Sequence, residues 1–191
     1  MKIAITGPIG SGKSYVCREL ARHGIDVYDC DAAAKRLMRQ DRSLQHALQS
    51  LLGEEVYREG TLQKAVLARF ILSGERQKQA VNDVVHPAVA IDFEQSGMDW
   101  LESAILFESG FHRRTRLDRV VCVTAPEELR IRRVMERDHI DKDKARQWVT
   151  AQMPQKEMMA QSDYVIVNDG EQNVAVQIER ILDNLLENKN K

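Results

Sequence analysis

Gly7-Pro8-Ile9-Gly10-Ser11-Gly12-Lys13-Ser14 is the stretch of sequence that decides the fold. It fits the pattern G-x-x-x-x-G-K-[ST] of a phosphate-binding loop at every fixed position. The β-prone run Lys2 to Thr6 comes directly before it, and an amphipathic helix pattern that stops at Gly24 follows it. Because the motif lies between a strand and a helix, the sequence predicts a site for the phosphate groups of a nucleotide.

The residue types of this motif each have a chemical reason. Glycine permits a positive φ and a close approach of phosphate oxygens, so that several backbone N–H groups converge on one anion. A helix that begins near Lys13 adds the positive end of its dipole. The Lys13 ammonium is expected to reach the β- and γ-phosphates of ATP, and the Ser14 hydroxyl is expected to bind Mg²⁺. A glycine turn capped by an exposed lysine is the alternative interpretation.

The order of strand and helix patterns predicts an α/β fold. Helical patterns separate the apolar runs, which suits a doubly wound parallel five-stranded sheet with right-handed crossovers. The expected strands are Lys2 to Thr6, Asp26 to Tyr28, Trp100 to Phe107, Arg119 to Thr124 and Asp163 to Val167. A final amphipathic helix is expected from Val174 to Leu186, and we predict a single domain over residues 1–191.

One long interval lacks a strand pattern. We expect a helical insertion over residues 32–99, with breaks at 41–42, 53, 60, 74 and His86-Pro87. An insertion beside the carboxyl ends of the strands is well placed to hold a second ligand.

The composition excludes several classes of protein. The 191 residues include 28 Lys and Arg against 29 Asp and Glu, and the net charge of -1 provides no general attraction to nucleic acid. No apolar run approaches the roughly 18 to 20 residues that span a membrane. The first residues enter a strand pattern directly and lack the apolar segment of a signal peptide. Three cysteines without paired spacing are typical of a reducing cytoplasm, so a cytoplasmic protein is expected.

Asp29 and Asp31 are the candidate catalytic acids. A kinase needs a carboxylate that accepts the proton of the substrate hydroxyl. Two residues apart on extended backbone, both side chains would point to the same side, at a sheet edge that adjoins the phosphate loop. The alternative is that Asp31 caps a helix that begins at Ala32; the phosphate loop favours Asp31 as the base. A GTPase is not supported, because Val167-Asn168-Asp169-Gly170 lacks the guanine-reading motif Asn-Lys-x-Asp.

Arginines gather on the helix predicted after the fourth strand. They are Arg130, Arg132, Arg133 and Arg137, of which the last two lie four residues apart and share a face. Two interpretations stay open: a solvated charged face, or a lid that closes over ATP and excludes water. His86 is likewise either a residue at a helix end or part of a site.

Taken in order, these pieces resemble the dephospho-coenzyme A kinase family, whose members have a P-loop kinase-type fold. The resemblance covers nearly the whole chain. Beyond the phosphate loop, the matching pieces are Gly24 to Asp31, His86-Pro87, Leu106-Phe107-Glu108, Arg137-Asp138, Ala151-Gln152-Met153 and Asp163 to Gly170. The chain departs from the family pattern at Pro8, Tyr15, Glu102, Ala104 and Gln63-Lys64. Pro8 cannot donate a backbone hydrogen bond to phosphate.

The resemblance implies ATP-dependent phosphorylation of the ribose 3′-hydroxyl of dephospho-coenzyme A, the last step of coenzyme A synthesis. It implies Asp31 as the general base, with Asp29 supporting the substrate site and His86 near the substrate. Lys13 and Arg137 complete the catalytic set. The helical insertion would bind the coenzyme A portion, and residues 138–160 would form the lid.

The same resemblance implies an ATP site and Mg²⁺ as cofactor. Asn168 and Gly170 would lie by the adenine. The phosphate side would be formed by Gly10, Ser11, Gly12, Lys13, Ser14 and Tyr15. The expected partners are ATP and dephospho-coenzyme A, without nucleic acid or membrane, in a monomer or small homo-oligomer.

Two other functions remain open at this point. A kinase of nucleosides, nucleotides or sugars on the same architecture would phosphorylate a different hydroxyl. A nucleotide-dependent switch or regulatory ATPase would hydrolyse ATP slowly, without any acceptor.

Overall fold

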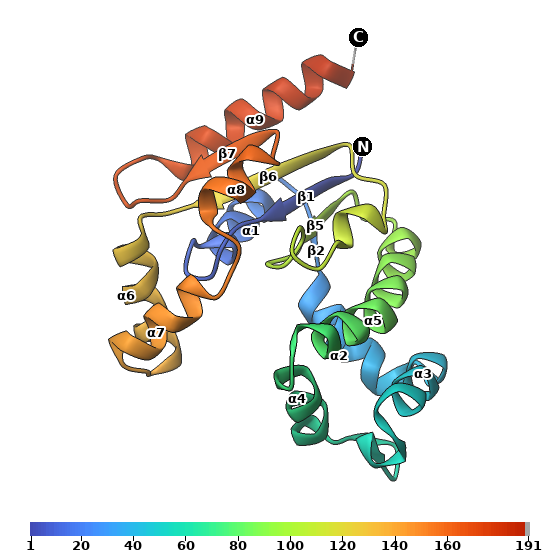
Figure 1. Cartoon of the computed structure of the whole chain (residues 1–191). Helices are drawn as coiled ribbons and strands as arrows, with labels where there is room; N and C mark the ends of the chain where they lie inside the picture. The colour runs from blue at the N-terminus through green and yellow to red at the C-terminus, as the bar shows by residue number, and fades with distance from the viewer. Residues whose placement is uncertain (190–191) are drawn as a thin grey trace. The chain divides into compact units, whose positions relative to one another are not determined.

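Residues 1–189 are described by the computed structural model, in which five strands form the main sheet (Figure 1). The order across the sheet is β2 (Val27–Asp29), β5 (Trp100–Glu102), β1 (Ile3–Thr6), β6 (Arg119–Thr124) and β7 (Tyr164–Val167). β1 pairs in parallel with β5 and β6, and β6 pairs in parallel with β7. The predicted α/β sheet is therefore confirmed.

The contacts between residues divide the chain into two units. The first comprises Met1–Tyr28, Met98–Glu108 and Arg116–Lys191, and the second comprises Asp29–Gly97 and Ser109–Thr115. The first unit holds the helices α1 (Lys13–Arg22), α6 (Glu127–Asp138), α7 (Lys142–Thr150), α8 (Gln155–Ala160) and α9 (Val174–Lys189). The second holds α2 (Cys30–Gln40), α3 (Arg42–Leu52), α4 (Lys64–Leu72), α5 (Glu75–Ser96) and the hairpin of β3 (Tyr57–Arg58) and β4 (Thr61–Leu62).

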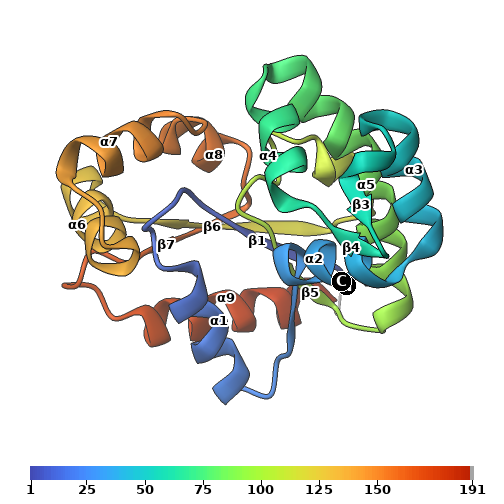
Figure 2. The ribbon, with the colours of Figure 1, turned by 90° about the horizontal axis from the view of Figure 1, so that it is seen from below.

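The core of the first unit lies between the sheet and one helical layer. α1 and α9 contact each other and lie on the same face of the sheet (Figure 2). Their apolar stripes pack against the strands in one cluster that includes the strand residues Ile5, Val121 and Ile166. Every residue of β1 is buried, as expected of a central parallel strand. Because the chain order reverses on the two sides of β1, the loop after this strand lies at the switch point where such sheets bind ligands.

In the second unit, α5 is the element on which α2, α3 and α4 pack. The predicted break at His86-Pro87 is wrong, because α5 continues through Pro87. Proline in a helix interior costs about 3 kcal/mol, since it removes one N–H donor and crowds the preceding turn. Burial on both sides of Pro87 offsets this cost: Val81, Val85, Val89 and Phe93 recur every four residues as one buried stripe. The other predicted breaks coincide with helix ends or, at Gly60, with the β3–β4 hairpin.

Two other boundaries differ from the prediction. The third strand was expected to reach Phe107, but β5 ends at Glu102 and turns follow it. Leu106 and Phe107 are buried in these turns, so their apolar character reflects burial rather than strand structure. The last helix reaches Lys189, beyond the expected end at Leu186. The sequence also predicts a frayed end over Asn188 to Lys191. Residues 188 and 189 are helical instead, and 190–191 lie outside the described residues.

Candidate active site

The loop between β1 and α1 has the backbone that phosphate binding requires. Gly10 and Gly12 have φ values of 77° and 95°. A Cβ on Gly10 would lie 2.6 Å from the Arg130 carbonyl oxygen, and one on Gly12 would lie 2.0 Å from Asn168 Nδ2. Both glycines are therefore needed for two separate reasons: the left-handed backbone and the close approach of α6 and of the segment after β7.

Several N–H groups of this loop are left available. Within residues 1–189, the N–H groups of Gly10, Gly12 and Ser14 have no hydrogen-bond partner. Two others are engaged: Ser11 N–H donates to the Pro8 carbonyl over 3.2 Å, and Ile9 N–H donates to Gln152 Oε1 over 2.6 Å. Unengaged N–H groups in a loop that leads into a helix form an anion-binding concavity.

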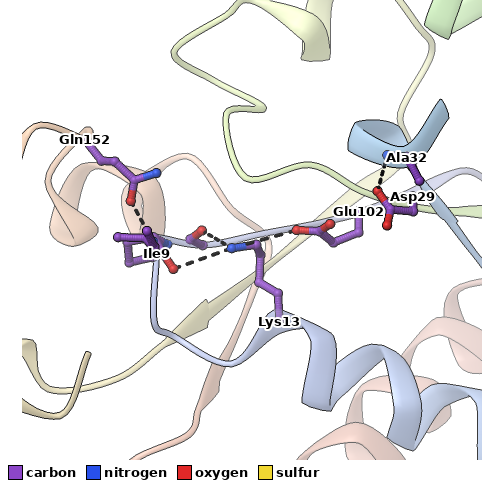
Figure 3. Close-up of polar contacts among 8 residues, drawn as sticks. Ile9, Lys13, Asp29, Ala32, Glu102 and Gln152 are labelled. Carbon is purple, nitrogen blue, oxygen red and sulfur yellow. Dashed lines mark hydrogen bonds and ion pairs between the residues drawn. The ribbon is translucent and has the colours of Figure 1, made fainter. Parts of the chain in front are cut away.

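The Lys13 side chain crosses this loop. Its Nζ donates to the carbonyl oxygens of Gly7 at 2.8 Å and Pro8 at 3.5 Å. It also forms an ion pair with Glu102 Oε1 at 3.8 Å, as Figure 3 shows. The Lys13 side chain is only 11% exposed, so the ammonium is held at the loop rather than extended into solvent. Glu102 thus contacts the phosphate loop, although in the sequence it stands out only as a departure from the family pattern.

Arg133 and Asn168 brace the loop backbone. Arg133 Nη1 donates to the carbonyls of Gly10 and Ser11 at 3.2 and 3.3 Å, and Nη2 donates to the Asn168 carbonyl at 3.1 Å. Asn168 Nδ2 donates to the Ser11 carbonyl at 2.9 Å. Burial lowers the pKa of Arg133, and the neighbouring Arg132 charge adds to this effect. The loop carbonyls of Gly10 and Ser11 are therefore bound by Arg133 of α6 and by Asn168, which follows β7. The unengaged N–H groups of the loop are not needed to hold it in place.

Arg137 lies one turn further along α6 and makes different contacts. Its guanidinium binds the Asp138 carboxylate at 2.7 Å and is 60% exposed. This hydrogen bond lowers the pKa of Asp138. The four-residue spacing had placed Arg133 and Arg137 on one face, but it gave no signal for choosing between them. The structure gives the loop contact to Arg133.

The remaining nucleotide-site candidates, Tyr15 and Gly170, are exposed. Tyr15 follows Ser14 at the start of α1 and is 41% exposed, with the Arg18 guanidinium 6.0 Å from its ring centroid. Gly170 has a φ of 90° in the turn after β7. The Asp169 side chain accepts hydrogen bonds from the N–H groups of Glu171 and Gln172 and thereby closes this turn.

Asp29 and Asp31 do not lie on one extended strand, so that expectation is wrong. The strand β2 ends at Asp29, which caps α2 by accepting the Ala32 N–H over 2.8 Å (Figure 3). Asp31 is in the first turn of α2, with an exposed side chain. The helix therefore begins two residues earlier than the sequence suggested, because Asp29 rather than Asp31 supplies the cap. The two carboxylates have separate environments as a result.

His86 lies in the middle of α5 and is half-buried. Its ring contacts Phe111 edge-on, with centroids 5.4 Å apart and an interplanar angle of 87°. Burial and the Arg114 charge lower its pKa to about 4, against opposing effects of Asp83 and Asp31. The structure therefore brings Asp31 and His86, two of the three predicted substrate-site residues, within electrostatic reach of each other.

This low pKa predicts a pH dependence of stability. Between pH 6.5 and 4 the unfolded chain binds a proton at His86 that the folded chain does not, so stability falls as the pH falls through this window. We expect His86→Gln to lose about 1 kcal/mol less than the wild type between pH 7 and pH 5, allowing for partial exposure. Urea unfolding at both pH values measures this difference, with exposed His46→Gln as control. Equal losses in wild type and His86→Gln would refute it.

The oxygen ligands at the loop fit Mg²⁺. Within residues 1–189, no group of three or more His, Cys, Asp or Glu side chains is placed to hold a metal ion. Mg²⁺ does not need such a group, because it keeps several waters and uses one or two protein oxygens together with substrate phosphates. The exposed Ser14 hydroxyl and the Glu102 carboxylate have oxygen atoms of the type that would suit such a site.

Comparison with known proteins identifies the family. The family model described as dephospho-CoA kinase matches residues 1–173. The chain belongs to the dephospho-CoA kinase family. It is therefore a kinase that phosphorylates dephospho-CoA with ATP in coenzyme A biosynthesis, and the resemblance inferred from the motifs is confirmed.

Individual relatives agree with this family. A dephospho-CoA kinase of Bacteroides fragilis is 39% identical over 185 residues, which covers 93% of this chain and 89% of the relative. The crystal structure of a Thermus thermophilus protein is 34% identical with a TM-score of 0.77, covering 98% of this chain and 97% of that one. A dephospho-CoA kinase from Campylobacter jejuni shares the fold, with a TM-score of 0.61 and 18% identity over 98% of this chain and 97% of that one.

None of the described helices is long and apolar enough to cross a membrane.

Proposed function

We propose that this dephospho-CoA kinase transfers the γ-phosphoryl group of Mg·ATP to the ribose 3′-hydroxyl of dephospho-coenzyme A. The observation that carries the nucleotide part is the set of unengaged N–H groups of Gly10, Gly12 and Ser14 beside the Lys13 ammonium. Donors fixed in this way bind phosphate oxygens without first being rearranged. Cytoplasmic location and a monomeric or small homo-oligomeric state stay predictions from the sequence.

The loop and its neighbours bind the phosphates in this proposal. The N–H groups receive the β-phosphate, and Lys13 exchanges the carbonyls of Gly7 and Pro8 for oxygens of the β- and γ-phosphates. Ser14, with Glu102, would hold Mg²⁺, which would neutralise negative charge on the phosphates when bound. Arg137, exposed on α6, and the segment over residues 138–160 cover the nucleotide and exclude water. Tyr15, Asn168 and Gly170 border the nucleotide as the sequence predicts.

Asp31 is the proposed general base. It is exposed in the first turn of α2, and no described residue hydrogen-bonds to its carboxylate. The proton of the 3′-hydroxyl passes to this carboxylate while the hydroxyl oxygen bonds to the γ-phosphorus. The bond between the γ-phosphorus and the β–γ bridging oxygen breaks, and ADP leaves. Asp29 holds α2 in place through its cap, and His86 borders the substrate as a neutral ring.

An acceptor-dependent assay tests this function. ADP release is followed with Mg·ATP, with and without dephospho-coenzyme A, and the product is compared with authentic coenzyme A by mass and chromatography. We expect ADP release that depends on the acceptor and a product that carries one added phosphate. Slow release unaffected by the acceptor would indicate an ATPase, and turnover of another hydroxyl compound alone would indicate a different small-molecule kinase.

A further inference from the structure

The segment between α7 and α8 contacts the phosphate loop through a single side chain. Gln152 Oε1 accepts the Ile9 N–H at 2.6 Å, and Figure 3 shows this bond on the side of the loop away from Glu102. Ile9 occupies the third position of the loop motif, directly before Gly10, whose N–H is one of the unengaged donors. The bond therefore reaches the part of the loop next to the phosphate-binding groups.

The segment that carries Gln152 is also hydrogen-bonded to the part of the chain that follows β5. The Glu108 carboxylate, six residues beyond the end of β5, accepts the N–H of Met153. Gln152 is half-buried, and no described residue binds its amide nitrogen. Because the backbone of the next residue, Met153, is hydrogen-bonded to Glu108, the side-chain oxygen Oε1 of Gln152 is held in a fixed position relative to the loop.

Ile9 is attached to the same part of the molecule through its side chain. The α6–α7 pair has an apolar cluster of its own, and Ile9 packs against it. The buried members of this cluster are Ile131, Val134, Ala145 and Val149. The side chain of Ile9 is thus packed against α6 and α7, while its N–H is hydrogen-bonded to the segment between α7 and α8.

We propose that Gln152 is a positioning residue for phosphoryl transfer. By holding the Ile9 N–H, it fixes the Pro8–Ile9 peptide, which is one peptide before the one that carries the Gly10 N–H, and so restricts the direction in which the Gly10 N–H points. It also makes the shape of the phosphate loop depend on the position of the segment that follows α7. This inference rests on the proposed function, because it assigns Gln152 a part in the same nucleotide site. We expect the hydrogen bond to act mainly on the rate of phosphoryl transfer, because small errors in the position of the reacting groups lower that rate strongly.

A leucine substitution removes the acceptor while keeping much of the volume. For Gln152→Leu we expect hydrogen exchange of the Ile9 amide, measured by NMR without added nucleotide, to become at least about tenfold faster. We also expect kcat to fall by about tenfold, with the KM for dephospho-coenzyme A within about twofold of the wild type. The control is Asn184→Leu, which replaces an exposed amide side chain on α9, outside the segment that covers the nucleotide, and should change none of these quantities.

A glutamate at the same position separates the hydrogen bond from general packing. Gln152→Glu keeps an oxygen acceptor for the Ile9 N–H but adds a negative charge beside the triphosphate. We expect it to restore slow exchange and most of kcat, while the KM for ATP rises. A side chain needed only for stability would instead lower kcat and thermal stability together in both variants.

Three outcomes overturn the inference. They are an unchanged Ile9 exchange rate in Gln152→Leu, a kcat within twofold of the wild type in that variant, and a Gln152→Glu variant as slow as Gln152→Leu. None of them bears on the proposed function, which is judged by turnover of dephospho-coenzyme A in the wild type. If wild-type turnover were absent, the Ile9 exchange rates alone would still decide whether the bond holds the loop.

Discussion

Lys13→Ala is expected to lower kcat/KM for ATP by about 10²- to 10³-fold and to weaken ATP binding as well. The Lys13 ammonium is held at the loop by two carbonyls and by Glu102, so it is already in place when the phosphates arrive. Its charge acts on both the bound nucleotide and the transferring phosphoryl group, and for this reason the loss appears in binding and in turnover. Calorimetric titration with ATP and steady-state ADP release measure the two effects.

An exposed cation outside the site provides the control for Lys13→Ala. Arg180 is exposed on α9, and its replacement by alanine should leave both measurements within about twofold of the wild type. Thermal unfolding of Lys13→Ala must be measured beside it, because the Glu102 carboxylate loses an ionic neighbour. Wild-type kinetics in Lys13→Ala would remove Lys13 from the phosphate site.

The parts of the fold that depend on local sequence could be predicted. The pattern correctly places the strand–loop–helix around the phosphate motif, the strand Arg119–Thr124 and a helix after that strand. Glycine, proline and a near-continuous apolar run are strong local signals in these places. The failures have a common cause in tertiary packing, which keeps α5 helical through Pro87 and buries Leu106 and Phe107 in turns.

Some residues of the candidate site could likewise be predicted from the sequence, and others could not. Lys13 and the loop glycines belong to one contiguous motif, so their grouping follows from the sequence alone. Arg133, Gln152 and Glu102 reach the loop from distant segments, by contacts that no spacing rule predicts. A signal for Arg133 in the sequence is that it shares a face of α6 with buried residues. A charged side chain on a buried face needs polar partners, so such an arginine is expected to bind a neighbouring segment.

Asp29 and Asp31 illustrate what the structure adds to a pair of neighbouring carboxylates. The sequence presented them as equivalent groups on one side of a strand. The Asp29 carboxylate accepts the Ala32 N–H, whereas no described residue hydrogen-bonds to the Asp31 carboxylate. The Asp29 carboxylate is thus engaged as the cap of α2, whereas the exposed Asp31 carboxylate is open to a substrate hydroxyl. The geometry of the helix start therefore favours Asp31 over Asp29 as the base.

Asp31→Asn is accordingly expected to lower kcat by about 10²-fold or more, with little change in ATP affinity. Asparagine has nearly the same shape but cannot accept the proton of the substrate hydroxyl. Loss of the charge from the first turn of α2 should cost only about 0.3 to 1 kcal/mol of stability, through the helix dipole. Steady-state kinetics with dephospho-coenzyme A, calorimetry with ATP and urea unfolding measure the three quantities separately.

The matched control for this substitution is Asp26→Asn, which alters an exposed carboxylate just before β2. It should leave kcat within about twofold of the wild type. A large fall in kcat in both variants would indicate a general effect of negative charge near this strand rather than proton transfer. A fall confined to Asp31→Asn, with ATP binding and unfolding nearly unchanged, is the result that only a base at this position explains, because neither nucleotide binding nor folding would then account for the lost turnover.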